Sequence, residues 1–308
     1  MKKTLVAAVV GLFACLLVAV PAASAYTPPP VVPWETLLPP LPTAQNPQFQ
    51  GVPGCTTPSM ACIDNEISTM DSLRLQFGCD HRAVFDTTYE LLTMTLRDMM
   101  NSDPHLFADP NWVIGEDATF AQLYYNSLNA YEQGQPVPEA WKIAFDTAAH
   151  GDANGPQDML LGINAHVQRD MPYMLASVGL RAPDGTSHKP DHDKFNEVLN
   201  QAYARVVDTI AKRFDPIENL QAPSFNPALG LAGNVSGDQL VQAWREGVWR
   251  NAERLLNAPN EAARQRVELT IEANAAASAR AIAAIQVPPG YRAQRDAYCA
   301  THNVGPLG

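Results

Sequence analysis

Apolar residues recur at helical spacing along most of this 308-residue chain. In residues 80–100 the repeating positions include Val84, Leu91 and Met99, with threonines completing the stripe. A period of three to four residues places such side chains on one face of a helix, so the segment predicts a helix with a buried face. The same pattern predicts further helices over residues 116–134, 137–151, from about 156, 191–214, 237–256 and 261–285, the last of these closing the helical region.

Residues 55–300 together predict an all-α fold. No segment alternates β-branched and polar residues between tight turns, as strands do, and no internal repeat is visible. Helical periodicity alone over this length is typical of a single, bundle-like multi-helix domain. Residues 26–54 are instead crowded with prolines, which favour an extended arm. A spacer is the simpler interpretation of this arm, and docking through Trp34, Leu37 and Leu38 is the alternative.

Residues 1–25 have the three parts of a secretory signal peptide. Lys2 and Lys3 precede a continuous apolar run, and the small residues of the sequence ASA follow it. The run is roughly 17 residues long, the lower limit for crossing a bilayer, so a membrane anchor is the alternative. We therefore expect cleavage near Ala25 and a mature protein that is secreted or associated with the cell envelope.

The cysteines agree with export. Cys15 lies in the signal peptide, which leaves Cys55, Cys62, Cys79 and Cys299 in the mature chain. An even number in an oxidising compartment predicts two disulfides, and three pairings are open. We favour a local Cys55–Cys62 bridge and a Cys79–Cys299 bridge that joins the two ends of the fold. A metal–thiolate site is the alternative, although no C-x-x-C sequence occurs.

The sequence LGINAHVQRDMPY, residues 161–173, places several candidate residues for a functional site beside an apolar helix face. On a helix, His166 and Asp170 fall together on one flank of the core face, and Asn164 falls within it. A nitrogen and an oxygen one turn apart can bind a metal ion, or can act as a general base and its orienting carboxylate. The alternative is a buried histidine bonded to Asp170, or an Asp170 that caps a helix restarting at Pro172.

Two other segments supply groups for the same site. The sequence HKPDHDKFN, residues 188–196, places Asp191, His192 and Asn196 at the start of a predicted helix, and His150 opens a polar loop. The prediction is a divalent metal site, with zinc favoured, in which Asp191, His192 and His150 complete the ligand shell. Asn164 and Asn196 would support it. The alternative is ordinary placement of acids in a first helical turn, with exposed loop histidines.

The sequence WREGVWRNAERLL carries three arginines, Arg245, Arg250 and Arg254. Glu246 and Glu253 lie at helical spacings from them, which predicts ion pairs on a solvated helix face. Recognition of an anion is the alternative for these arginines.

Four segments carry a family resemblance: DHRAVFDTTYELLTMTL, PEAWKIAFDTA, LLGINAHVQRDMPYML and WREGVWRNAERL. They resemble an uncharacterised, mainly actinobacterial family, domain of unknown function family 5995, over residues of about 65–285. The resemblance implies a shared fold and no particular reaction.

A looser resemblance is to the secreted, all-helical group of zinc phospholipases C and single-strand nucleases. His166 and Asp170 match the His-x-x-x-Asp helix of that group, which implies metal ligands at these two positions. The chain departs from the group's second motif because Asn196 stands where an acid would follow His192. The resemblance therefore implies at most a one- or two-metal site.

Charge and motifs narrow the function further. Without Lys2 and Lys3 the mature chain has 19 basic and 32 acidic residues, a net charge of −13, which disfavours general nucleic-acid binding. The H-E-x-x-H, G-x-S-x-G, P-loop and G-x-G-x-x-G sequences are absent. Two hypotheses follow. One is an exported metal-dependent hydrolase acting on phosphoester or lipid-like substrates, and the other is a non-catalytic envelope protein that binds an apolar ligand or a protein partner.

Overall fold

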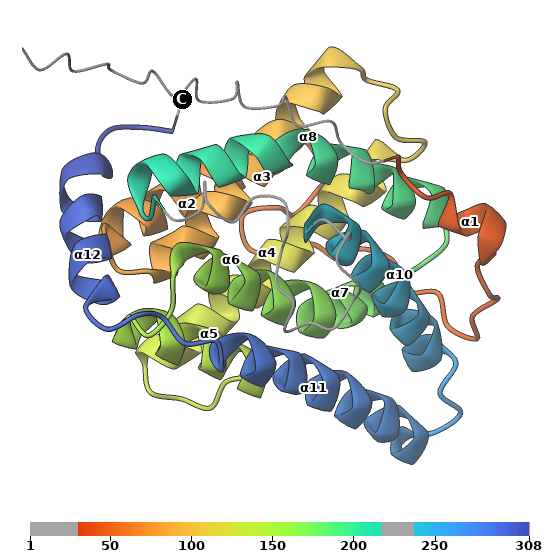
Figure 1. The fold of residues 1–308 in the computed structure, drawn as a ribbon. Helices are drawn as coiled ribbons and strands as arrows, with labels where there is room; N and C mark the ends of the chain where they lie inside the picture. The colour runs from red at the N-terminus through yellow and green to blue at the C-terminus, as the bar shows by residue number, and fades with distance from the viewer. Residues whose placement is uncertain (1–29, 217–236, 308) are drawn as a thin grey trace, which may run out of the picture.

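A computed structural model describes residues 30–216 and 237–307, and in this part of the chain regular structure is helical apart from two isolated β-bridges (Figure 1). The predicted signal peptide lies outside the described residues. The all-α prediction is confirmed. The elements are α1 (Trp34–Leu37), α2 (Met60–Phe77), α3 (Arg82–Ser102), α4 (Pro110–Glu132), α5 (Glu139–His150), α6 (Gly155–Ile163), the π-helix η1 (Asn164–Asp170), α7 (Met171–Val178), α8 (Lys189–Arg213), α10 (Gly237–Leu256), α11 (Glu261–Ala283) and α12 (Tyr291–His302).

The segment α6–η1–α7 runs through the middle of the domain, between α8 on one side and α11 on the other (Figure 1). It contacts α3, α4, α5, α10 and α11. Leu161, Met174 and Leu175 on this segment are completely buried. A helix that is apolar around most of its circumference is stable only when other helices cover it on all sides. The central position of this segment therefore follows from its sequence.

Two helix boundaries differ from the sequence prediction. Helix α4 begins at Pro110, six residues before the predicted start, because the Asp109 side chain accepts a hydrogen bond from the backbone N–H of Trp112 at 3.0 Å. Proline suits a first helical turn, because a backbone N–H there has no acceptor within the helix and its absence costs no hydrogen bond. Helix α12 is an additional helix beyond the predicted last one. No helix of the described residues is long and apolar enough to cross a membrane.

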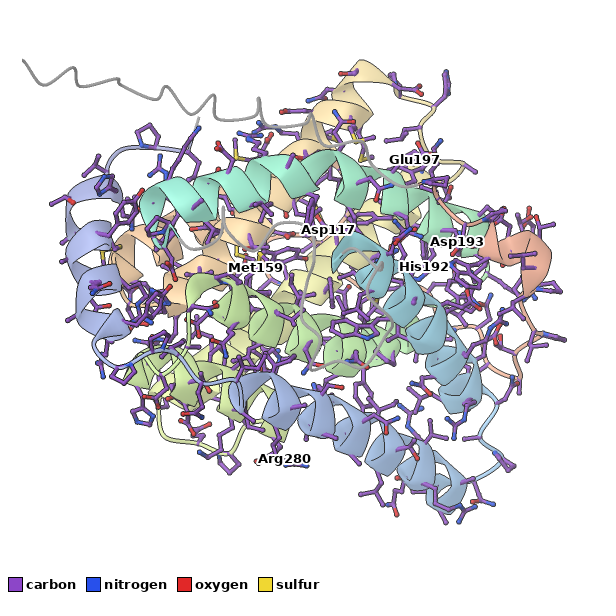
Figure 2. The ribbon with its side chains drawn as sticks, viewed as in Figure 1. Asp117, Met159, His192, Asp193, Glu197 and Arg280 are labelled. Atoms are coloured by element: carbon purple, nitrogen blue, oxygen red, sulfur yellow. A yellow bond between two sulfur atoms is a disulfide. The ribbon has the colours of Figure 1, made fainter. Side chains whose placement is uncertain are left out.

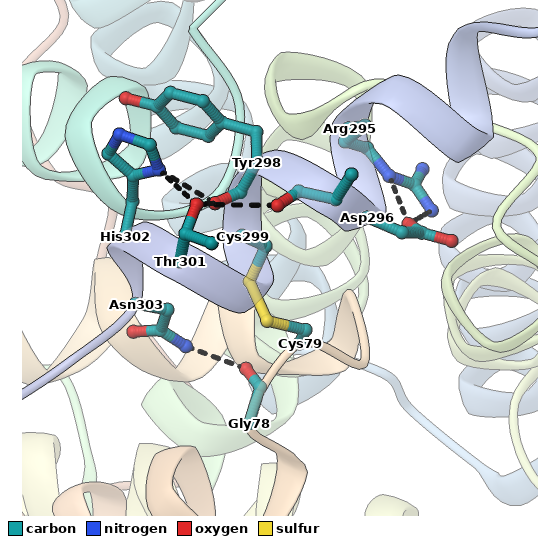
Figure 3. Close-up of a disulfide and its surroundings, with 10 residues drawn as sticks. Gly78, Cys79, Arg295, Asp296, Tyr298, Cys299, Thr301, His302 and Asn303 are labelled. Atoms are coloured by element: carbon teal, nitrogen blue, oxygen red, sulfur yellow. Dashed lines mark hydrogen bonds and ion pairs between the residues drawn. A yellow bond between two sulfur atoms is a disulfide. The ribbon is translucent and has the colours of Figure 1, made fainter.

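The two predicted disulfides are both present. Cys55 is bonded to Cys62, and Cys79 is bonded to Cys299. The second bond holds α12 against the turn between α2 and α3, where the Asn303 side chain also donates a hydrogen bond to the Gly78 carbonyl at 2.8 Å (Figure 3). A bridge between residues 220 apart in sequence strongly restricts the unfolded chain. The disulfide thus fixes the C-terminal helix to the domain.

The described part of the proline-rich arm lies along the helical domain. The backbone N–H of Leu41 donates to Glu253 Oε1 at 2.7 Å. Asn257 accepts from the N–H of Ala44 at 2.7 Å and donates to the carbonyl of Pro42 at 3.0 Å. These contacts bind the arm to α10 through its backbone. The short helix α1 within the arm departs from the prediction of an extended segment, and beyond α1 the arm gains backbone partners by docking on the domain.

Further along the arm, two glycines of the helical domain permit close approach. Gly179 has φ +85°, and a Cβ atom there would lie 1.9 Å from the Pro47 carbonyl oxygen. At Gly115 a Cβ atom would lie 3.0 Å from the Phe49 ring. A side chain at either position would displace the arm. By contrast, Leu37 stays 61% exposed.

Candidate functional site

His166 and Asp170 lie on η1, a π-helical segment, rather than on an uninterrupted α-helix. The backbone N–H of Met171 donates to the carbonyl of His166, five residues back. Pro172 follows immediately and has no N–H to donate, so the α-helical pattern cannot continue across this point. Single π-helical turns inside helices frequently lie at functional sites. The unusual backbone thus coincides with the sequence segment that carries the candidate chemistry.

The Asp170 carboxylate is completely buried, and both of its oxygens accept hydrogen bonds. Trp141 Nε1 donates to its Oδ2 at 2.8 Å, and Arg169 Nη1 donates to its Oδ1 at 2.8 Å. His166 Nδ1 lies 3.1 Å from Oδ2 and donates to it, since the carboxylate can only accept. The side chain does not cap α7. Of the two structural roles predicted for Asp170, pairing with a buried histidine is the one that the structure has.

Aromatic rings enclose His166. Its ring stacks on Phe120 with centroids 3.4 Å apart, and Tyr89 and Phe85 meet it edge-on at 5.0 and 5.6 Å. Burial lowers the pKa of His166, although the neighbouring Asp170 acts in the opposite direction, so the ring is neutral at neutral pH. His166 Nε2 has no hydrogen-bond partner in the described part of the chain. The His166–Asp170 pair therefore lies in a closed, largely aromatic environment.

His192 lies on α8 where this helix approaches α10 (Figure 2), and both of its ring nitrogens have partners within the fold. Its Nε2 donates to the Arg245 carbonyl at 3.2 Å, and its Nδ1 accepts from Arg245 Nη2 at 3.2 Å. Burial, together with the nearby charges of Arg245 and Lys189, lowers the pKa of His192 well below its ordinary value. A neutral histidine with one donor and one acceptor satisfied has no lone pair left for a metal.

The other predicted ligands have separate roles. The Asp191 carboxylate accepts hydrogen bonds from the backbone N–H groups of Ala108 and Asp109 at 2.7 and 2.8 Å, and so fixes the chain just before α4. His150 is exposed at the end of α5. Among the residues that the structure describes, no three His, Cys, Asp or Glu side chains are placed to hold a metal ion. The structure joins His166 to Asp170 and gives Asp191 and His192 partners of their own.

The two predicted supporting asparagines are both completely buried. Asn164 donates to the carbonyl of Ala275 on α11 at 2.9 Å and accepts from Gln168 at 2.6 Å. It therefore ties the π-helical segment to α11. Neither the side-chain nitrogen nor the side-chain oxygen of Asn196 has a hydrogen-bond partner in the described structure.

A cavity of about 40 Å³ lies between α3, α4, α8 and α10, with η1 and α7 below it. On that measure it has room for about three water molecules. Apolar side chains form most of its wall: Leu92, Phe120, Met171, Phe195, Leu199 and Val241. Glu116, Asp117 and Arg245 are the charged residues that line it, and Tyr89 adds a hydroxyl-bearing ring. A mainly apolar pocket with a few convergent polar groups is the common form of a small-molecule site.

The two acids of the cavity are adjacent on α4. Burial raises the pKa of Glu116 to about 8, even though Arg245 acts to lower it. Burial also raises the pKa of Asp117 to about 7, while a 3.4 Å hydrogen bond from Tyr89 favours its charged form. On α2, burial and Asp117 together raise the pKa of Glu66. At neutral pH the Glu116 carboxyl is therefore mostly protonated and can donate a hydrogen bond.

Arg245 is only 3% exposed, which corrects the prediction of a solvated face. The Arg245 guanidinium lies 5.0 Å from the centre of the Phe195 ring. Arg250 does pair with Glu246 at 2.8 Å and with Glu253 at 3.0 Å, as predicted. The two arginines differ because five residues correspond to about 140° around a helix. Arg250 thus reaches the outer side of α10, while Arg245 points into the domain.

Sequence reasoning did not single out Glu116 and Asp117 as site residues. A signal was available, since Glu116 lies four residues before Phe120 and Asp117 lies seven before Tyr124, and both of these aromatic residues are buried. Acids at those spacings share the buried face. Buried acids with raised pKa values in a pocket are candidates for a functional site.

Residues 63–285 match the model of a family of unknown function, DUF5995. No curated protein and no solved structure matches the chain.

Proposed function

We propose that this chain, which belongs to the DUF5995 family of unknown function, binds a small ligand whose polar end enters the cavity between α4, α8 and α10 and whose apolar body lies against the rim of that cavity. The proposal takes up the second predicted function, a non-catalytic exported protein that binds an apolar ligand. Two disulfides agree with export, since such bonds persist in oxidising compartments.

One observation carries the proposal. Arg245 Nε and Asp117 Oδ2 are buried, have no hydrogen-bond partner among the described residues, and belong to side chains that line the same cavity. An unpaired buried polar group costs about 1–3 kcal/mol, and native proteins keep such groups few. A ligand that paired with both atoms would recover that cost on binding.

The walls of the cavity indicate what the rest of the ligand is made of. Leu92, Leu199 and Val241 are partly exposed, whereas Phe120 and Phe195 are buried. The apolar wall therefore continues from the buried polar groups to a rim that reaches the surface. Each CH₂ group that a ligand buries along such a wall contributes about 0.8 kcal/mol.

The proposal can be tested with three six-carbon probes, 1-hexanol, hexanoate and hexylamine, titrated into the mature protein by isothermal calorimetry. At least one probe is expected to bind. A Val241→Trp variant would fill the rim and weaken that binding at least about tenfold, the ratio that corresponds to 1.4 kcal/mol. Leu269→Trp, at an exposed position of α11, is the matched control and should bind like the parent protein.

The proposal fails if none of the three probes binds, or if Val241→Trp binds as tightly as Leu269→Trp. The metal-dependent hydrolase stays a prediction from the sequence. Elemental analysis of protein purified without an affinity tag tests it, because a zinc ligand at His166 requires a stoichiometric metal that is lost in His166→Ala.

A further inference from the structure

We infer that the ligand of this cavity is a small carboxylate with an apolar tail, whose carboxylate accepts a hydrogen bond from the Arg245 Nε–H group. This inference rests on the proposed ligand binding and adds the charge and chemical class of the ligand.

The first step concerns the charge of Arg245. No ion pair joins its guanidinium to any carboxylate whose side chain the structure describes, and the residue is almost completely buried. Lys189, the other buried cation nearby, is paired with Asp193 at 2.6 Å and with Glu246 at 2.7 Å. A buried charge without a partner is strongly unfavourable. Arg245 is therefore the cation of this region that lacks a direct counter-ion.

The second step concerns the N–H groups of Arg245. Its Nη2 group donates to the His192 carbonyl at 2.6 Å and to His192 Nδ1, and its Nη1 group reaches only the sulfur of Met171 at 3.6 Å. Nε–H has no partner in the described residues. The contacts with His192 hold the guanidinium in place while its remaining donor stays available. A carboxylate or phosphate oxygen is the natural acceptor for such a donor, since charge-assisted hydrogen bonds are the stronger kind.

The third step concerns the two acids. Glu116 and Asp117 both line the cavity, burial raises the pKa of each carboxyl, and a protonated carboxyl at either position can donate a hydrogen bond to an anion. An ammonium group would need these acids ionised, and it would place a second cation beside Arg245. The polar end of the cavity thus presents donors from three residues, which favours an anionic head group over a cationic one.

The fourth step concerns size. The cavity has room for about three water molecules, so only a head group of the size of a carboxylate fits inside it, and a phosphate with its five heavy atoms is too large. The tail then lies outside this volume, against the partly exposed side chains of Leu199 and Val241 at the rim. A short fatty acid or an arylalkyl acid has both parts.

The six-carbon probes distinguish this inference from the proposed function itself. Hexanoate is expected to bind about tenfold or more tightly than 1-hexanol or hexylamine at pH 7, because a charge-assisted hydrogen bond is stronger than one between neutral groups. Binding of 1-hexanol or hexylamine at equal or higher affinity would overturn the carboxylate inference while leaving the ligand site intact. Failure of all three probes would overturn both.

A substitution of Arg245 tests whether the preference for hexanoate depends on the side chain of this residue. Arg245→Met is expected to remove the preference for hexanoate and to keep the binding of 1-hexanol, whereas Arg254→Met, at an exposed position on the same helix, should change neither. Retention of the preference in Arg245→Met would overturn the assignment. If Arg245→Met does not fold, NMR contacts decide instead: nuclear Overhauser effects must connect the hexanoate methylenes to the methyl groups of Leu199 and Val241, and their absence overturns the inference.

Discussion

The buried carboxyl of Glu116 makes the free energy of unfolding of this protein fall as pH rises. A single isosteric substitution should abolish this contribution. Glu116 faces Arg245, Asp117, Asp191 and, at 3.5 Å, the Nδ1 atom of His192. Glu116→Gln keeps the shape of the side chain and removes its titration. The comparison of the two proteins therefore isolates one group.

The magnitude follows from proton binding. Burial raises the pKa of Glu116 from its ordinary 4.5 to about 8. Between these values the folded protein holds a proton that the unfolded chain has released, so the free energy of unfolding falls by about 1.4 kcal/mol for each unit of rising pH. The stabilising effect of the proton is complete below pH 4.5 and is lost as pH rises toward 8. From pH 4.5 to pH 7 the loss amounts to about 3 kcal/mol.

Other groups titrate in the same pH range, and their contributions must cancel when the parent protein and the Glu116→Gln variant are compared. Burial raises the pKa of Asp117, which gives a loss of the same sign. Burial lowers the pKa of His166, His188 and His192, so their contribution is lost instead as pH falls below 6.5. All of these groups remain in the Glu116→Gln variant. The difference between the two proteins, rather than either curve alone, measures Glu116.

The assay is urea unfolding followed by tryptophan fluorescence and circular dichroism at pH 4.5, 5.5, 6.5, 7.5 and 8.5, with the disulfides intact. We expect equal stability at the acid end, and a Gln variant about 3 kcal/mol more stable than the parent near pH 7. The slope of the free energy against urea should be the same in both proteins. A gap that stays below about 1 kcal/mol over the whole range would refute the reasoning, because it would show that Glu116 is already ionised in the folded protein.

Three further predictions concern the fold. Asn164→Ala removes the bond to Ala275 and should lower the free energy of unfolding by about 1–3 kcal/mol; no change in urea unfolding would contradict the tie to α11. Replacement of Cys79 and Cys299 by serine should cost about 5 kcal/mol, about twice the cost of losing the other bridge, since loop entropy grows with the 220-residue separation; equal losses in thermal unfolding would argue against this. Asn257→Ala releases two arm contacts and should speed proteolysis of the arm with little change in melting temperature; an unchanged cleavage rate would refute arm docking.

Only part of the candidate site could be predicted from the sequence. His166 and Asp170 were placed together correctly, because two residues four apart on a helix share a face whatever the rest of the fold does. Asp191 and His192 lie on a different helix, and whether they point toward the first pair depends on how α8 crosses the domain. Arg245 was assigned to the wrong side of its helix because the acids at helical spacing from it offered a local partner that Arg250 takes instead.

The sequence by itself determined the helical fold class, most helix positions, the number of disulfides and the internal His166–Asp170 pair. These features depend on local periodicity, on the number of cysteines and on spacing within one helix. Only the tertiary structure decided that Glu116 and Asp117 of α4 meet Arg245 of α10 around one cavity, and that the arm docks on α10. Contacts between distant segments depend on helix crossing and packing, and no local pattern of residues encodes those.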